Sequence, residues 1–599
     1  MSHFTTRPEI RGTFGVVAST HWLASSVGMA VLERGGNAFD AAVAAGFTLQ
    51  IVEPHLNGPG GDVPILFNAA GEDMPRLLCG QGVAPAGASI AHYRSEGLDI
   101  MPATGHLAAV VPGSFAAWMT LLRDYGTMEV ADVLAPAIAY ARDGYPLVPR
   151  IVEAIASVED LFRRHWPSSA AIYLPGGALP STERLFRNPV IADTWDRVIA
   201  ETNGAATREA RIDSAIRIFH EGFIAEAMTD FVREPVLDSS GHAHAGVLTM
   251  DDMAAWRPGY ETPLSLAYGD FKVFKGGPWS QGPVFLQQLA LLKTVDIAAM
   301  DPNGPDFVHT IIEAAKLAFA DREAYYGDPD WVDVPIAALL GDDYNRIRAA
   351  LMSDRASYDL VPGAIDGYTA RLPDLSGIAA ATAPGTVGGA GEPTMAQYSK
   401  RALEAATGDT CHVDVIDRHG NMVAATPSGG WLQSSPVVPE LGFGLTTRAQ
   451  MFWLEDGLPA SLAPGKRPRS TLSPSLAHRD GKPYMVWGTP GGDQQDQWTV
   501  TQFLRHADHG MNLQEAVDAP LFHSAHFPSS FYPRQAQPGR LVVEERLGAK
   551  TIADLEARGH DVAVDGPWTI GRMCAASRDG DMLKAAATPR GMQGYAVGR

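Results

Sequence analysis

The chain has 599 residues, of which 46% are hydrophobic and 19% are charged, and this composition excludes a disordered protein. Its 47 basic and 68 acidic residues give a net charge of −21, which disfavours nucleic acid or an anionic membrane as a partner. No secretory signal and no apolar run of ~18 residues is evident. We therefore expect a folded cytoplasmic protein, although the length leaves the number of domains open.

The first strong pattern is a helix followed by a glycine-rich loop and a strand. Asn37 is a predicted N-cap, because Asp40 lies three residues later and an alanine-rich run follows. The loop NGPGG at residues 57–61 ends this helix and lacks the GKS/T ending of a phosphate-binding loop, so we predict no nucleotide cofactor. Further helices are expected at about residues 129–143 and 306–326, from apolar residues at helical spacing.

The composition changes near residue 377. The stretch GIAAATAPGTVGGAGEPTM at residues 377–395 is rich in Gly, Ala, Pro and Thr and buries little apolar surface. It predicts a flexible connector that extends to about residue 409. A flexible connector suits a chain that is cut just downstream of it, because the new ends must be able to move apart.

The stretch GDTCHVDVID at residues 408–417, followed by RHGNMVAAT, predicts a β-hairpin with its turn at Gly420 and Asn421. Cleavage of the Asp409–Thr410 bond would give Thr410 an α-amino group with a pKa of ~8, which is a base for its own hydroxyl. A threonine that leads a strand is often only a β-former. The motif alone therefore leaves a nucleophilic and a structural role open.

Several separate blocks make the sequence similar to the gamma-glutamyltranspeptidase family of N-terminal nucleophile hydrolases, over most of the chain and in the family's order. The blocks are GGNAFDAAVAAGFTLQIVEPHLNGPGG, AVVPGSFAAWMTLLRDYG, LTMDDMAAWRP, GGPWSQGPVFLQQLALL, FVHTIIEAAKLAFADREAYYGD, GDTCHVDVIDRHGN, LAPGKRPRSTLSPSL, GTPGG and ATPRG.

The resemblance implies a four-layer αββα sandwich of the α/β (α+β) class and a proenzyme, or zymogen, that cuts itself before Thr410. Residues 1–409 would form the large subunit and residues 410–599 the small subunit of one composite unit. The implied activity is that of an amidohydrolase or acyltransferase acting through an acyl-enzyme on Thr410. Ser428 resembles the second hydroxyl that bonds the nucleophile, and Gly491 and Gly492 resemble the oxyanion loop, where backbone N–H groups reach developing negative charge. The same glycine pair is also compatible with a simple turn before a helix.

The sequence departs from the family where the glutamyl group is bound. Gln81 stands where the family has an arginine for the substrate α-carboxylate, so about 1.5 to 3 kcal/mol of charged hydrogen bonding is missing. Met451 stands where an aspartate meets the α-ammonium, and Arg448 nearby would repel that ammonium. The substrate is therefore expected to be a small amide, by analogy an anionic one, without the glutamyl pattern.

The candidate substrate-binding residues are Gln81, Arg448, Arg467, Ser470, Thr471 and Asp493. The two arginines and Asp493 are equally compatible with surface positions or salt bridges. Ser470 and Thr471 match the family's hydroxyl pair near the substrate, but the same residues would also suit the end of a strand. The sequence leaves open whether water or an amine accepts the acyl group and whether heterodimers assemble into a homo-oligomer.

Four alternatives remain beside this interpretation. The first is a genuine gamma-glutamyltransferase or glutathione hydrolase, and the second is an inactive ligand-binding relative. A metal-dependent amidohydrolase is disfavoured because HExxH and CxxC spacings are absent, so we predict no metal site. Cys411 would be a nucleophile only if cleavage exposed it, and His412 lies two strand residues, or roughly 6.6 Å, from Thr410. We expect His412 to be structural.

Overall fold

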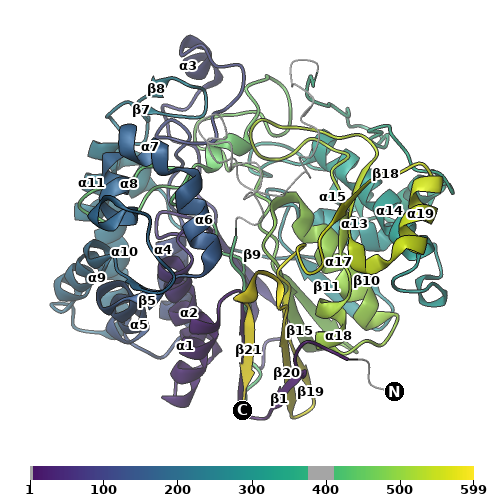
Figure 1. Cartoon of the computed structure of the whole chain (residues 1–599), viewed down its shortest axis with the longest axis horizontal. Coiled ribbons are helices and arrows are strands. Elements are labelled where there is room, and N and C mark those ends of the chain that lie inside the picture. The colour runs from purple at the N-terminus through teal and green to yellow at the C-terminus, as the bar shows by residue number, and fades with distance from the viewer. Residues whose placement is uncertain (1–3, 376–409) are drawn as a thin grey trace.

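The computed structural model describes residues 4–375 and 410–599, and two seven-stranded sheets lie face to face at its centre (Figure 1). The predicted connector at residues 377–409 falls outside the described residues. Helices cover the outer face of each sheet, so the chain forms the four-layer αββα sandwich that the sequence predicted.

The first sheet carries the predicted hairpin near its middle. Its strands, in spatial order, are β21 (Tyr595–Gly598), β2 (Gly15–Ser19), β12 (Val413–Asp417), β13 (Met422–Ala425), β3 (Val63–Asn68), β4 (Arg76–Gly80) and β9 (Gly259–Glu261). All neighbouring strands are antiparallel, and Val415 lies opposite Val17 of β2 and Val423 of β13. The strand that follows the proposed cleavage point, β12, is thus hydrogen-bonded on one side to β2 and on the other to its hairpin partner β13.

The second sheet is also antiparallel throughout. Its strands, in spatial order, are β1 (Ile10–Gly12), β20 (Met582–Ala587), β19 (Cys574–Asp579), β15 (Lys482–Gly488), β14 (Ser475–Arg479), β11 (Phe271–Lys275) and β10 (Leu264–Tyr268). Both sheets mix strands from before and after residue 410. The two predicted subunits therefore share both sheets and the apolar core between them.

Small apolar side chains fill the space between the sheets. Val16, Ile416 and Met422 of the first sheet pack in one buried cluster with Val486 and Ala576 of the second. Many members of this cluster are alanines and valines, which suit the close packing of two sheets. This inner core joins the two sheets.

Two further cores lie between the sheets and the outer helices. The first sheet is covered by α1 (Trp22–Glu33), α2 (Ala38–Val52), α4 (Ser114–Tyr125), α5 (Val130–Asp143), α6 (Pro149–Ser157), α7 (Glu159–Arg164), α8 (Pro167–Tyr173), α9 (Pro189–Thr202), α10 (Arg208–Glu221), α11 (Phe223–Phe231) and α12 (Met250–Ala255). The second is covered by α13 (Gly282–Leu292), α14 (Pro305–Tyr325), α15 (Ile336–Leu339), α16 (Asp342–Ala349), α17 (Gln495–Ala507), α18 (Leu513–Asp518) and α19 (Ala549–Ala557).

Smaller elements decorate the sandwich. They are helix α3 (Ile90–Ser95), two two-stranded sheets, β5 (Tyr145–Pro146) with β6 (Leu185–Phe186) and β7 (Val236–Leu237) with β8 (Ala243–His244), and a three-stranded sheet of β16 (Phe522–Ser524), β17 (Arg540–Glu544) and β18 (Asp561–Asp565). Among the helices of the described residues, none is long and apolar enough to cross a membrane.

The predicted local elements are confirmed. Asn37 caps α2 in a capping box with Asp40, and α5 and α14 match the two helices predicted from apolar spacing. The Asp40 carboxylate also accepts the backbone N–H of Thr127, at 2.8 Å. One short polar side chain therefore starts α2 and ties it to the loop after α4.

Candidate active site

Thr410 lies three residues before β12, at the N-terminal end of this central strand of the first sheet. It forms an isolated antiparallel bridge with Ser428, and its Oγ1 donates a hydrogen bond to Ser428 Oγ at 3.3 Å. The backbone N–H of Cys411 continues the ladder to Pro427 O at 2.9 Å. Both hydroxyl residues are fully buried. The structure thus brings together the two hydroxyls that the sequence predicted as nucleophile and partner.

Arg572 and Glu53 lie against Thr410 on the side of β2 and β21. The Nη2 of Arg572 donates to the carbonyl oxygen of Thr410 at 3.2 Å, and its Nη1 lies 3.5 Å from Glu53 Oε1. Glu53 also accepts hydrogen bonds from the Thr20 hydroxyl at 2.7 Å and the Cys411 thiol at 3.0 Å. These buried contacts fix the backbone that carries the Thr410 hydroxyl.

The same surroundings make Cys411 a poor nucleophile. Burial, together with the Glu53 carboxylate, raises the pKa of the Cys411 thiol well above its ordinary value. A thiol must ionise to attack a carbonyl, so this one is held in its unreactive form. The geometry supports the sequence argument against a cysteine mechanism.

Gly491 and Gly492 form a turn that leads into α17. Their φ angles are +126° and +54°, and a Cβ added to Gly491 would lie 2.2 Å from the Trp498 ring, so the turn requires glycine at this position. Within the described part of the chain, neither glycine N–H makes a hydrogen bond. Two adjacent unpaired amides in such a turn form a concave site for an anion. Their role as oxyanion donors stays a prediction.

Two contacts place this glycine loop beside the start of β12. The Arg572 backbone N–H donates to Thr489 Oγ1 at 3.2 Å, while the Arg572 side chain holds the Thr410 carbonyl. A Cβ on Gly488 would lie 2.3 Å from the His412 ring, so the loop packs directly on that residue. Arg572 therefore links the predicted nucleophile to the predicted oxyanion loop.

His412 has partners of its own. Its Nδ1 lies 2.9 Å from Thr426 Oγ1, and its Nε2 lies 2.9 Å from Asp414 Oδ1, with all three side chains buried. Both ring nitrogens thus have partners, in β12 and directly after β13. This arrangement agrees with the structural role expected for His412.

Arg448 is paired with a carboxylate that the sequence analysis did not single out. Its Nε and Nη2 bind the two oxygens of Asp62 at 2.8 and 3.0 Å, and both side chains are buried. Burial raises the pKa of Asp62, while Arg448 and a hydrogen bond from Gln81 oppose that rise. Asp62 in turn exchanges backbone hydrogen bonds with Ser428 at 2.8 and 3.0 Å. The structure therefore brings Gln81 and Arg448 together beside the predicted site.

Arg467 lies among three carboxylates. It contacts Asp328 at 2.7 Å and Asp330 at 2.9 Å, and it also pairs with Glu261. Three carboxylates carry more negative charge than is needed to neutralise the one guanidinium group. The contacts favour the salt-bridge alternative for Arg467 over substrate recognition.

The other predicted substrate residues are buried near the glycine loop. Asp493 accepts both the N–H and the hydroxyl of Ser530 at 2.7 Å and pairs with Arg322; although burial acts to raise its pKa, these partners lower it. Ser470 Oγ accepts the Leu472 N–H at 3.3 Å. The Thr471 hydroxyl is buried and has no hydrogen-bond partner among the described residues. Of these three residues, Thr471 is therefore the one whose side-chain hydroxyl is available to a substrate.

Three residues of this site were missed in the sequence analysis. Asp62 directly follows the NGPGG block and Glu53 lies four residues before it, so the available signal was that both residues lie close to a glycine-rich loop. Arg572 lies in a stretch, TIGRMC, that carries no such signal. Its role became visible only from the fold.

Comparisons with known proteins agree with this architecture. The gamma-glutamyltranspeptidase family profile matches residues 24–598. The oxamate amidohydrolase proenzyme of Klebsiella pneumoniae is 31% identical, with 98% of each chain covered. The solved structure of LmbA2991HD is 53% identical with a TM-score of 0.93, and both chains are covered completely. The cephalosporin acylase of Bacillus halodurans is 25% identical with a TM-score of 0.82, and it covers 100% of this chain and 98% of its own.

These matches extend over the whole sandwich, including both sheets and Thr410. The relatives include an amidohydrolase proenzyme and an acylase as well as the name-giving transpeptidases. The chain belongs to the gamma-glutamyltranspeptidase family, in a branch that has diverged from its name-giving members.

Proposed function

We propose that the chain is a self-processing amide hydrolase whose nucleophile is Thr410 and whose acyl group is not glutamyl. The observation that carries the proposal is the Thr410–Ser428 hydroxyl pair at 3.3 Å, at the ends of two central strands and near the Gly491–Gly492 turn. A protein that only bound a ligand would have no chemical need for this combination. The inactive ligand-binding alternative is therefore disfavoured.

In the processing step, Thr410 Oγ attacks the carbonyl carbon of Asp409 while the peptide nitrogen of Thr410 leaves and takes up a proton. The resulting ester joins the two halves through Thr410 Oγ, and water then hydrolyses it to release the carboxylate of Asp409. The products are residues 1–409 and 410–599, and Thr410 now has a primary amine that serves as its base. Arg572 holds the carbonyl of Thr410 during this change.

In catalysis, the Thr410 hydroxyl gives its proton to the new amine and attacks the substrate amide. The N–H groups of Gly491 and Gly492 stabilise the negative charge that develops on the carbonyl oxygen, a contribution of about 3 kcal/mol per donor. The protonated amine gives its proton to the leaving nitrogen. Water or an amine then removes the acyl group from Thr410.

The substrate assignment rests on charge. Arg448 binds Asp62, Arg467 lies among carboxylates, and Gln81 is uncharged, so none of the three reproduces the family's carboxylate-binding arginine. These three residues therefore suit a small acyl group without the α-amino and α-carboxylate groups of an amino acid better than a glutamyl group. Oxamate, the substrate named for the Klebsiella relative, is a reasonable first compound.

A two-substrate assay tests the proposal. The processed enzyme should release ammonia from oxamate or a similar small amide, and it should act far more slowly on gamma-glutamyl-p-nitroanilide. The Thr410→Ala variant should do neither, which controls for contaminating hydrolases. Rapid release of p-nitroaniline, with no turnover of small amides, would favour the genuine gamma-glutamyltransferase instead. The cytoplasmic location stays a prediction, tested by fractionating cells that express the native gene.

A further inference from the structure

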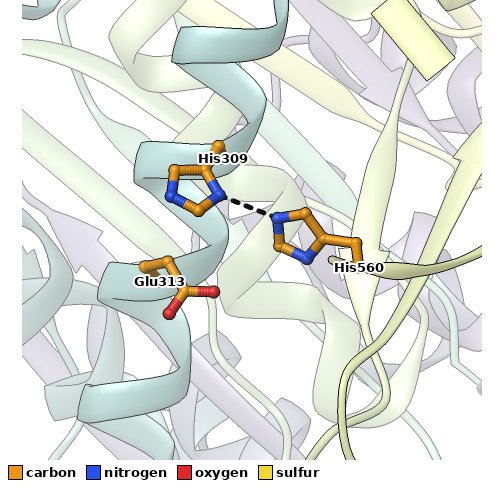
Figure 2. Close-up of side chains that lie close together, drawn as sticks. All are labelled: His309, Glu313 and His560. Carbon is orange, nitrogen blue, oxygen red and sulfur yellow. Dashed lines mark hydrogen bonds between the residues drawn. The ribbon is translucent and has the colours of Figure 1, made fainter. Parts of the chain in front are cut away.

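A second polar cluster lies within the outer helix layer of the other sheet, among residues that the proposed chemistry does not use. His309 and Glu313 are one turn apart on the same face of α14, and His560 stands just before β18. All three side chains are buried, and Figure 2 shows them facing one another. One ligand atom from each residue lies within 4.8 Å of the other two.

The spacing suits a small cation. His309 Nδ1 lies 2.8 Å from His560 Nε2. Two ligands bound at ~2.0–2.1 Å to a tetrahedral zinc ion are roughly 3.3 Å apart, so a small outward movement of the rings would admit the ion. Two histidines and one carboxylate, with water in the fourth position, form a known zinc ligand set.

Backbone groups orient the ligands for this role. The Nε2–H of His309 donates to the Ser353 carbonyl at 2.8 Å, which leaves the lone pair of Nδ1 directed at His560. Glu313 Oε2 accepts the Ser357 N–H at 3.2 Å. The remaining nitrogen of His560, Nδ1, is buried without a hydrogen-bond partner in the described parts of the chain. Because the proposed ion binds Nε2, this Nδ1 would need a water molecule as its own partner.

The cluster is also accessible. A surface cavity of about 440 Å³ is lined by His309, Glu313 and Ser353, and it offers a route for the ion and its water. Lys316 competes with the ion, because its Nζ donates to Glu313 Oε1 at 2.7 Å and to Ser357 O at 2.8 Å. Glu313 nevertheless keeps further lone pairs on both oxygens.

We propose that His309, Glu313 and His560 bind one divalent transition-metal ion, of the zinc class, which cross-links α14 to the segment before β18. Two ligands come from residues 1–409 and the third from residues 410–599. If the chain is cut before Thr410, as proposed above, the ion joins the two polypeptides at a point far along the sequence from the cut. No metal site was predicted from the sequence, because His560 is 251 residues from His309 and the three ligands match no short motif.

The test uses the full protein, stripped with a chelator and then dialysed against Zn²⁺ or Co²⁺. Plasma mass spectrometry should find about one ion per chain in the parent, and Co²⁺ should give the visible absorption of a tetrahedral site. His560→Gln and Glu313→Gln should each lower the metal content at least about tenfold, whereas His165→Ala, at an exposed histidine, should not change it. Circular dichroism shows whether each variant is folded.

Two further measurements separate this site from ordinary packing. Lys316→Gln should raise the affinity for Zn²⁺, because it removes the competing cation, while a merely structural Glu–Lys pair predicts no such gain. Metal binding should persist in uncut Thr410→Ala protein, so its outcome is independent of the proposed function. A parent protein that binds no stoichiometric Zn²⁺ or Co²⁺, or equal metal content in His560→Gln, would overturn the proposal.

Discussion

The buried pair of Arg448 and Asp62 gives the sharpest test of which residues shape the site and which read the substrate. We predict that Arg448→Met lowers the free energy of unfolding by about 3–5 kcal/mol, since removal of one partner leaves a buried charge uncompensated. The structure supports this size, because two short hydrogen bonds join the groups and the two side chains are at most 1% exposed.

The double variant Asp62→Asn/Arg448→Met should recover most of this loss. It removes both charges, and the asparagine can still bond the Gln81 amide. Neutral replacements of a buried pair are often tolerated, whereas broken pairs are not. The two substitutions should therefore be strongly non-additive, as expected for residues in direct contact.

The assay is urea unfolding, followed by tryptophan fluorescence, of proteins that all carry Thr410→Ala and so remain single chains. Arg233→Met provides the control, because its pair with Asp230 is exposed and should leave the transition within error of the parent. A loss below about 1 kcal/mol for Arg448→Met, or simple additivity in the double variant, would refute the reasoning. Arg448 would then be available for the substrate.

Three other predictions concern the oxyanion loop, the nucleophile support and acid stability. Gly491→Ala should lower kcat at least about 100-fold, because the new methyl group would overlap the Trp498 ring. The control Gly481→Ala, at a glycine with φ +75° and open space around it, should retain activity. Equal initial rates for the two variants would contradict the role assigned to Gly491. Arg572→Gln should lower kcat about 10- to 150-fold with little change in KM, from the loss of a charged hydrogen bond worth about 1.5–3 kcal/mol, and a pure KM effect would argue for substrate binding. Burial lowers the pKa of His220 to about 3, so the folded state binds fewer protons than the unfolded state between about pH 6.5 and pH 3. The free energy of unfolding should therefore decrease as the pH is lowered through this window, by up to about 1.4 kcal/mol per pH unit from this residue. Urea unfolding at pH 7 and pH 5 should show a smaller decrease in the free energy of unfolding for His220→Gln than for the parent.

Local patterns were sufficient to predict individual helices and the hairpin. The N-cap at Asn37, the apolar spacing of α14 and the turn at Gly420 each act within a few residues, so the sequence alone reveals them. The order of family blocks supplied the sandwich and placed Thr410 beside Ser428. These two hydroxyls are only 18 residues apart, on the two strands of one hairpin.

The rest of the site depends on contacts between distant segments. Arg448 and Asp62 are 386 residues apart, and Arg572 and Thr410 are 162 residues apart. No periodicity or spacing connects such residues, because the sheets bring them together only after folding. Substrate specificity was harder to predict for the same reason. From the sequence alone Arg448 could bind a substrate carboxylate, and only the fold shows that it is paired with Asp62.

The most direct test of the central claim is the mass and N-terminal sequence of the purified protein. The account predicts two chains that add up to the 63.9 kDa precursor, with the smaller one beginning Thr-Cys-His-Val, and a single chain for Thr410→Ala. A single uncut 63.9 kDa chain that still hydrolyses amides, or a cut at another residue, would contradict it.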